Sequence, residues 1–338
     1  MNSPKNSFWI PAFAGMTEKR AGRTWAVTFF LSRSAALIFI FCGCQSRDQI
    51  DPRRQLQQIL GVSEWRRQAL RPEILERSVF KGVEIEKLSL KELAGARTAY
   101  VIKTAAGPLA RPCVAVIHGH YSKATDIVGL TKSKHISAVG LELAKNGFIV
   151  LAPDIEIDYR DMKKETKTAL LLAMESKTLM GQRVESVLKW VHYLRNRPDA
   201  ERGRMGCLGW SMGGQIALYA TAFDPDINAV YISNAFDSYR WLSQSPLQSP
   251  DNYIPGIWRF GDKDRVGALV APRPLLIEHA SNDATAPFET VEDIAHSLVE
   301  VYEKIGAHDR LMFLKHHKAH NFSGSDTVIW FSKWLRPE

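Results

Sequence analysis

A serine between two glycines is the residue whose surroundings most directly indicate chemistry in this chain. The segment Gly209-Trp210-Ser211-Met212-Gly213 has the pattern Gly-x-Ser-x-Gly. An apolar run at 205–208 precedes it, and a helical pattern at 213–223 follows it. A strand, a strained turn and a helix in this order expose a serine hydroxyl as a nucleophile, and the glycines leave room for the turn. We therefore predict that Ser211 is a nucleophile; the alternative is an ordinary strand–helix turn.

A serine hydroxyl needs a general base, and the base needs a carboxylate that fixes its tautomer. Two candidates lie downstream, Asp283 and His320, each in a loop that follows a later apolar run. We predict that His320 is the base and that Asp283 orients it. His317 remains an alternative base, and Asp237 and Glu278 remain alternative acids.

A short motif upstream indicates where the oxyanion of an acyl-transfer reaction would be stabilised. Ile117-His118-Gly119-His120-Tyr121 begins at the end of another apolar run. A tight His-Gly turn brings a backbone N–H toward the nucleophile, and the N–H of Met212 would be the second donor. We predict the backbone N–H of His120 for this role, with Tyr121 as the alternative. Because no carboxylate or cysteine adjoins the His-x-His pair, we predict no metal and no cofactor.

Short apolar runs alternate with longer helical patterns along most of the chain. This alternation predicts an α/β fold with a mostly parallel sheet that helices cover on both faces. Period-two alternation at 83–88 and 98–103 predicts a hairpin at one sheet edge. Residues 45–79 have helical spacing and predict a helical lead-in to a domain at 80–338. The runs are 113–117, 148–152, 205–209, 229–232, 274–277 and 311–314, and the helical patterns are 136–145, 165–194, 213–223, 291–304 and 327–335.

Residues 236–269 form a segment that is too long for an ordinary connection, and we predict an insertion. It follows the strand after the Ser211 turn, so it should emerge on the face where Ser211 points. It is rich in aromatic residues, some of which would wall a narrow acyl pocket and stack on a sugar or an aromatic alcohol; the alternative is that they only pack the insertion onto the body. The candidate pocket residues here and near the motifs are Tyr121, Trp210, Trp241 and Trp258.

The motifs taken together resemble the α/β-hydrolase superfamily, and most closely its dienelactone hydrolase-like and acetyl xylan esterase-like groups. The resemblance covers roughly residues 80–335. It is carried by Ile-His-Gly-His (117–120), Val-Leu-Ala-Pro-Asp (150–154), Gly-Trp-Ser-Met-Gly-Gly (209–214), Asn-Asp-x-x-x-Pro (282–287) and Ala-His-Asn-Phe (319–322).

This resemblance implies hydrolysis of a carboxylic ester by a Ser211–His320–Asp283 triad through an acyl-enzyme, with a short acyl group of the acetyl type. The substrate would be a small-molecule or polysaccharide ester. Dienelactone hydrolases proper use a cysteine nucleophile, whereas position 211 is serine, so their lactone activity does not carry over. The alternatives are a peptidase or aminoacyl hydrolase of similar fold and a non-catalytic binding module on the cell surface.

The first 44 residues have the character of a targeting segment. A basic stretch precedes the apolar residues 34–43, which are too few to span a bilayer and fit the core of a secretory signal. The segment ends near Cys44, where Phe-Cys-Gly-Cys resembles the lipidation motif of bacterial lipoproteins. We predict an exported protein, periplasmic or anchored to the membrane only through a lipid at Cys44. The first 15 or so residues resemble a mis-assigned start, which would make Met16 the first residue.

Composition limits the remaining possibilities. The chain has 338 residues, 45% of them hydrophobic and 24% charged, which is enough to bury a large core. Four cysteines are too few for a disulfide framework. The formal net charge is +8, and basic residues are not interleaved with aromatic ones, so we predict no nucleic-acid partner.

Overall fold

The computed structural model describes residues 7–8 and 50–336, apart from 64, 66–69, 92, 95, 109, 156–161 and 247. Cys44 and the predicted targeting segment lie outside the described residues, except for a two-residue strand, β1 (Ser7–Phe8). Within the described part of the chain, no helix is both long enough and apolar enough to cross a bilayer.

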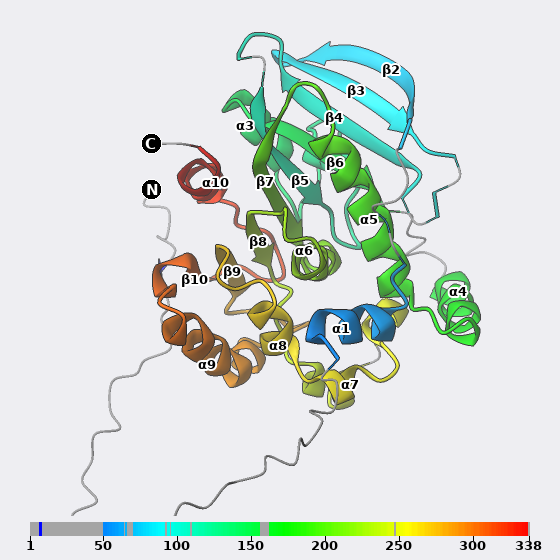
Figure 1. The fold of residues 1–338 in the computed structure, drawn as a ribbon, viewed down its shortest axis with the longest axis vertical. Helices are drawn as coiled ribbons and strands as arrows, with labels where there is room; N and C mark the ends of the chain where they lie inside the picture. The colour runs from blue at the N-terminus through cyan, green and yellow to red at the C-terminus, as the bar shows by residue number, and fades with distance from the viewer. Residues whose placement is uncertain are drawn as a thin grey trace, which may run out of the picture.

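A single twisted sheet forms the centre of the molecule (Figure 1). Its strands pair in the order β1-β10-β9-β8-β7-β5-β6-β4-β3-β2. The pairs from β10 to β6 are parallel, whereas β2, β3, β4 and β6 pair antiparallel. The predicted mostly parallel sheet is thereby confirmed. The strands are β2 (Glu73–Phe80), β3 (Val83–Ser89), β4 (Thr98–Thr104), β5 (Arg111–Ile117), β6 (Ile149–Asp154), β7 (Ala200–Trp210), β8 (Ala229–Ser233), β9 (Leu275–Ala280) and β10 (Leu311–His316).

Helices cover both faces of this sheet, and alternate residues of the central strand face the two layers. Cys113, Ala115 and Ile117 of β5 belong to one buried cluster, and Val114 and Val116 belong to the other. The first cluster contains side chains of α1 (Pro52–Leu60), α5 (Leu179–Arg195), α6 (Met212–Phe223), α8 (Lys263–Ala268) and α9 (Glu289–Lys304). The second contains those of α2 (Ala124–Ile127), α3 (Val139–Lys145) and α10 (Thr327–Leu335). A strand buried on both faces has to be apolar throughout, which explains the unbroken apolar runs.

Two details differ from the sequence-based expectation. The lead-in is not helical throughout: α1 occupies Pro52–Leu60, but Glu73–Phe80 forms edge strand β2 and pairs with β3 along its length. The long helical pattern at 165–194 is divided into α4 (Met162–Met174) and α5, since Ser176 adopts a left-handed conformation with φ of 57°. Helical spacing in the sequence therefore did not reveal the strand β2, which depends on cross-strand pairing, or the break between α4 and α5, which depends on one backbone turn.

The insertion at 236–269 consists of short helical segments rather than a domain. They are η2 (Tyr239–Ser243), η3 (Pro250–Asn252), α7 (Ile257–Phe260) and α8. In Figure 1, α7 lies beside α1 and α8 lies near α6, whereas η3 contacts α4 and α5. Trp241 fastens η2 to the loop after β9, because its indole N–H donates to the carbonyl of Thr285 at 3.1 Å. The insertion thus reaches the same end of the sheet as the loop that carries Asp283.

A buried ion cluster joins this insertion to the body. Arg183 of α5 is 2% exposed and donates to Asp251 of η3 at 2.6 Å and to Glu165 of α4. Ser249, beside Asp251, hydrogen-bonds the Nε2 of His120 at 2.9 Å. One guanidinium therefore holds two carboxylates from different segments next to the turn that contains His120.

Replacing Arg183 by methionine should destabilise the protein by about 3–5 kcal/mol, because two buried carboxylates lose their cation. Urea unfolding followed by circular dichroism measures this free energy. The matched control is Arg202→Met, which removes an exposed arginine from β7 and should change stability by less than about 0.5 kcal/mol. Equal effects of the two substitutions would contradict the role given to the cluster.

The same variant should also change how stability depends on pH. Burial alone would raise the pKa of Asp251, but the neighbouring His120 and Arg183 outweigh it and hold that pKa below its ordinary value. A lowered folded-state pKa adds stability at pH values above the unfolded pKa of about 4, and this stability is lost as pH falls through the folded pKa. Without Arg183, burial should raise the pKa of Asp251, so Arg183→Met should recover part of its lost stability between pH 7 and pH 5.

Candidate active site

Ser211 lies at the sharp turn between β7 and α6, and its backbone is strained. Its φ of 56° and ψ of −125° lie in a region that residues other than glycine rarely adopt. Close packing around the turn leaves no space for side chains at the flanking glycines. A Cβ at Gly209 would lie 2.0 Å from the carbonyl oxygen of Gly213, and one at Gly213 would lie 2.2 Å from the carbonyl oxygen of Ile117. The two glycines thus allow β7, α6 and β5 to meet beneath the serine.

The structure brings together the three side chains proposed as nucleophile, base and acid. The hydroxyl of Ser211 lies 2.8 Å from Nε2 of His320, and Nδ1 of His320 lies 2.5 Å from a carboxylate oxygen of Asp283. The other carboxylate oxygen of Asp283 accepts the backbone N–H groups of Thr285 and Ala286 at 2.8 and 3.1 Å. Both oxygens of Asp283 are therefore occupied by donors, which fixes the carboxylate and, through it, the imidazole.

The protonation state of Asp283 suits this arrangement. Burial alone would raise the pKa of Asp283, but the hydrogen bond from His320 and the electrostatic interactions with His320 and His279 outweigh it and hold that pKa below its ordinary value. The carboxylate therefore stays ionised and accepts the Nδ1–H of His320. In that tautomer, Nε2 carries a lone pair that can accept the hydroxyl proton of Ser211.

Two backbone N–H groups at the pocket are available for a negatively charged oxygen. Neither Met212, the first residue of α6, nor His120 uses its backbone N–H to donate to any acceptor within the described ranges. Both residues line the pocket that contains Ser211 and His320, which has a volume of about 360 Å³. The N-terminus of α6 adds positive potential there. Tyr121, the alternative donor, lines the same pocket with its side chain 64% exposed.

The histidines of the 117–121 motif have structural partners. Nδ1 of His118 donates to the carbonyl of Gly119 at 2.9 Å, and its Nε2 accepts the backbone N–H of Ile155 at 2.9 Å. Burial lowers the pKa of His118, consistent with a neutral ring. With both nitrogens engaged, His118 braces the loop and has no lone pair left for a metal.

The alternative bases and acids have other partners. His317 is exposed and contacts the hydroxyl of Ser281 at 3.2 Å. Asp237 lines the pocket but pairs with Lys263 at 3.0 Å. Glu278 is fully buried on β9, and one of its carboxylate oxygens accepts the backbone N–H of Ser323 at 3.0 Å.

Glu278 has a supporting role that its position in the sequence did not indicate. Its carboxylate accepts the hydroxyls of Tyr231 and Ser233 at 2.5 and 2.6 Å. It also accepts the backbone N–H groups of Ser323 and Gly324 at 3.0 and 3.3 Å. Four donors from β8 and from the loop after His320 thus converge on one buried carboxylate, which anchors the histidine loop to the sheet.

Two further residues that sequence reasoning missed hold the same loop. Asn234, at the end of β8, has φ of 48°, donates to the carbonyl of Asn321 at 3.0 Å and accepts the N–H of Ala280 at 2.8 Å. His135 contacts the side chain of Asn321 at 3.0 Å. Asn234 could have been noticed because it follows a buried strand, as Asp283 does, whereas nothing in the local sequence marks His135.

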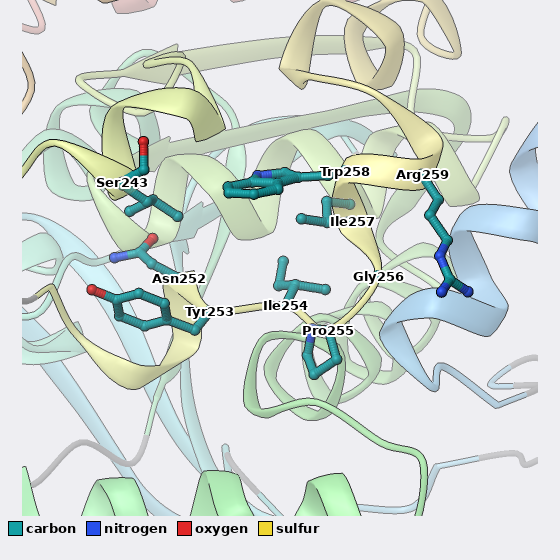
Figure 2. A pocket seen from close by; sticks show the side chains of 10 residues that line it. Ser243, Asn252, Tyr253, Ile254, Pro255, Gly256, Ile257, Trp258 and Arg259 are labelled. Carbon is teal, nitrogen blue, oxygen red and sulfur yellow. The ribbon is translucent and has the colours of Figure 1, made fainter.

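The four predicted pocket residues occupy three different environments. Tyr121 and Trp241 line the Ser211 pocket. Trp210 does not, because it is fully buried beneath His320, with ring centroids 5.4 Å apart. Trp258 lines a different pocket within the insertion (Figure 2). The strand end thus buries the indole of Trp210 away from the wall of the Ser211 pocket, and α7 directs that of Trp258 into the neighbouring pocket.

Known proteins share this architecture. The glucuronoyl esterase from Solibacter usitatus superposes with a TM-score of 0.63 at 13% identity, over 84% of this chain and 92% of that one. Acetyl xylan esterase 1 from Thermoanaerobacterium sp. JW/SL YS485 superposes with a TM-score of 0.59 at 16% identity, over 85% of this chain and 94% of that one. In sequence, YtaP of Bacillus subtilis (strain 168), named as a hydrolase, is 27% identical over 201 residues, which are 57% of this chain and 67% of YtaP.

The match to a family of sequences extends over more than half of the chain. The model of the dienelactone hydrolase family aligns with residues 99–310, which include the turn at Ser211 and the loop of Asp283. The serine at position 211 is compatible with hydrolytic chemistry, because hydrogen bonds connect Asp283 to His320 and His320 to Ser211. On this evidence the chain belongs to the dienelactone hydrolase family.

Proposed function

We propose that the protein is a serine esterase that hydrolyses carboxylic esters with a short acyl group. The observation that carries this proposal is the unbroken series from Asp283 through His320 to Ser211, with bonds of 2.5 and 2.8 Å. The fold shared with an acetyl xylan esterase and a glucuronoyl esterase supports it.

Each step of the proposed reaction uses a group already in place. Ser211 Oγ attacks the ester carbonyl while Nε2 of His320 takes its proton, and Asp283 stabilises the imidazolium that forms. The N–H groups of Met212 and His120 stabilise the tetrahedral oxyanion. The imidazolium then protonates the departing alcohol oxygen. Water, deprotonated by His320, cleaves the acyl-enzyme and regenerates the serine.

The size and lining of the Ser211 pocket support a small acyl group. Its volume is about 360 Å³, and that volume also has to hold the ester group and the attacking water. Trp241 is held against the pocket by its bond to Thr285, and Met162 of α4 lines it as well. We therefore propose acetyl-type esters as substrates, with activity falling as the acyl chain lengthens from acetyl to hexanoyl.

Ser211→Ala should lower kcat for 4-nitrophenyl acetate by at least about 10⁴-fold, because the nucleophile is removed while the fold is kept. The release of 4-nitrophenol, followed by absorbance, measures the rate, and circular dichroism checks the fold. A fluorophosphonate should label Ser211 in the wild type. Unchanged turnover by the alanine variant would contradict the esterase proposal, and turnover of peptide anilides instead of esters would favour a peptidase.

His320→Ala should match the serine variant in severity, because the two residues act as a unit. Asp283→Asn should lower kcat by about 10⁴-fold, as the equivalent substitution does in serine proteases, since it favours the wrong imidazole tautomer. The matched control is His317→Ala, three residues away, exposed and bonded to Ser281. If His317→Ala lost its activity while His320→Ala kept it, the general base would have been assigned incorrectly.

We also propose export of the protein, anchored by a lipid at Cys44, on the basis of the sequence of residues 1–44 alone. A fusion of residues 1–50 to a reporter should leave the cytoplasm of a bacterial host. Labelled palmitate should enter the full chain and be absent from Cys44→Ser. Reporter that stays entirely in the cytosol would contradict export, and export without label would contradict the lipid anchor.

A further inference from the structure

The insertion contains a second pocket, lined in part by the exposed aromatic side chains Tyr253 and Trp258. Its volume is about 630 Å³, larger than that of the Ser211 pocket, and its apolar wall includes Leu242, Ile254 and Ile257. Trp258 is 66% exposed and Tyr253 43% exposed, so solutes can reach both rings. Figure 2 shows the indole of Trp258 extending from α7 across the pocket, toward the side where Ser243, Asn252 and Tyr253 lie.

This Trp258 pocket adjoins the Ser211 pocket. Leu242 and Asn252 line both. The hydroxyl of Tyr253 accepts the backbone N–H of Gln248 at 3.1 Å, and Gln248 lines the Ser211 pocket. Asn252 in turn accepts the side-chain N–H of Gln215, one turn of α6 beyond the nucleophile, at 2.8 Å. The segment from Gln248 to Tyr253 is therefore a shared wall that is fixed to the helix after Ser211.

The two pockets differ in chemistry. The Ser211 pocket is lined by polar side chains, among them Asn234, Asp237 and Ser249. The Trp258 pocket offers two rings and aliphatic side chains, with polar groups from Ser243, Asn252 and Arg259 at its margin. Aromatic rings bind flat, apolar faces well, since stacking buries a large area at low conformational cost. A substrate that spans both pockets would place its flat apolar part against Trp258.

We propose that the Trp258 pocket is a second substrate subsite, which receives the alcohol part of the ester and favours an alcohol with a flat apolar face. This inference rests on the proposed function: if the acyl group is short and stays in the Ser211 pocket, the larger part of the ester that extends beyond it is the alcohol. An aryl ring and the C–H face of a sugar ring both have this shape. Ser243 and Asn252, on the side toward which the Trp258 indole extends, would serve the hydroxyls of a sugar.

The kinetics of an acyl-enzyme give this subsite a specific signature. The alcohol leaves when the acyl-enzyme forms, so its contacts act in kcat/KM, which covers the steps up to acylation. Acetate esters that differ only in the alcohol share one acetyl-enzyme and one deacylation step. An alcohol subsite should therefore change the ratio of kcat/KM between alcohols, whereas an acyl subsite would change the dependence on acyl-chain length.

The test compares 2-naphthyl acetate, ethyl acetate and acetylated xylo-oligosaccharide, using Trp258→Ala and Tyr253→Ala. We expect each substitution to lower the kcat/KM ratio of naphthyl to ethyl acetate by about 3- to 10-fold, the contribution of one aromatic stacking partner. The control is Ile329→Ala, which removes an apolar side chain that is 68% exposed on α10 and should leave the ratio unchanged. Circular dichroism verifies that each variant is folded.

The three substrates distinguish an aryl alcohol from a sugar as the occupant of the subsite. If kcat/KM relative to ethyl acetate also falls for the acetylated oligosaccharide, a sugar is a natural occupant. If it falls for naphthyl acetate alone, the occupant is an aryl alcohol. Ratios unchanged in both folded variants would overturn the subsite, and so would a change confined to the acyl-chain profile. Ser211-dependent hydrolysis of ethyl acetate would persist in either case, so failure of this inference is distinct from failure of the proposed function.

Discussion

The contact between Gly209 and Gly213 is the constraint on which the rest of the site depends. It closes the turn between β7 and α6 so tightly that a Cβ at Gly209 would lie 2.0 Å from the carbonyl oxygen of Gly213. Ser211 is consequently held at a positive φ directly after β7, with its hydroxyl 2.8 Å from Nε2 of His320. Gly213 in turn packs against the end of β5, so the first N–H of α6 and the turn at His120 lie at the same pocket. One tight turn thus positions both the nucleophile and the proposed oxyanion donors.

Buried polar side chains hold the remaining two members of the site in register with that turn. Asp283 and His320 lie on separate loops after β9 and β10, and loops alone would not keep a hydrogen bond of 2.5 Å. Glu278 and Asn234 bind the backbone beyond His320 to the sheet, and Trp241 binds the insertion to the Asp283 loop. These buried polar side chains are tolerated in the interior because each has several hydrogen-bond partners there. A buried carboxylate without partners would destabilise the folded protein.

The alternation of apolar runs and helical patterns was sufficient to predict the sheet, its covering helices and the loops that bear Ser211, Asp283 and His320. Those predictions depend on local patterns at strand ends. The strand at Glu73–Phe80 and the break at Ser176 were missed because pairing with β3 and a backbone turn decide them. The cluster of Glu165, Arg183 and Asp251 could not be predicted, since it joins segments far apart in the chain. The division of the insertion's aromatic residues between two pockets could not be predicted, because the sequence shows that an insertion is aromatic but not where its rings point.

The central claim is that Ser211 carries the acyl group during turnover. It is tested most directly by mixing the enzyme with 4-nitrophenyl acetate, quenching in acid within the first turnovers and mapping acetylated peptides by mass spectrometry. The account predicts acetyl on the peptide that contains Ser211, appearing together with a burst of nitrophenol and disappearing as substrate is exhausted. Steady ester hydrolysis with acetyl on another residue, or with no acetylated peptide at all, would contradict it.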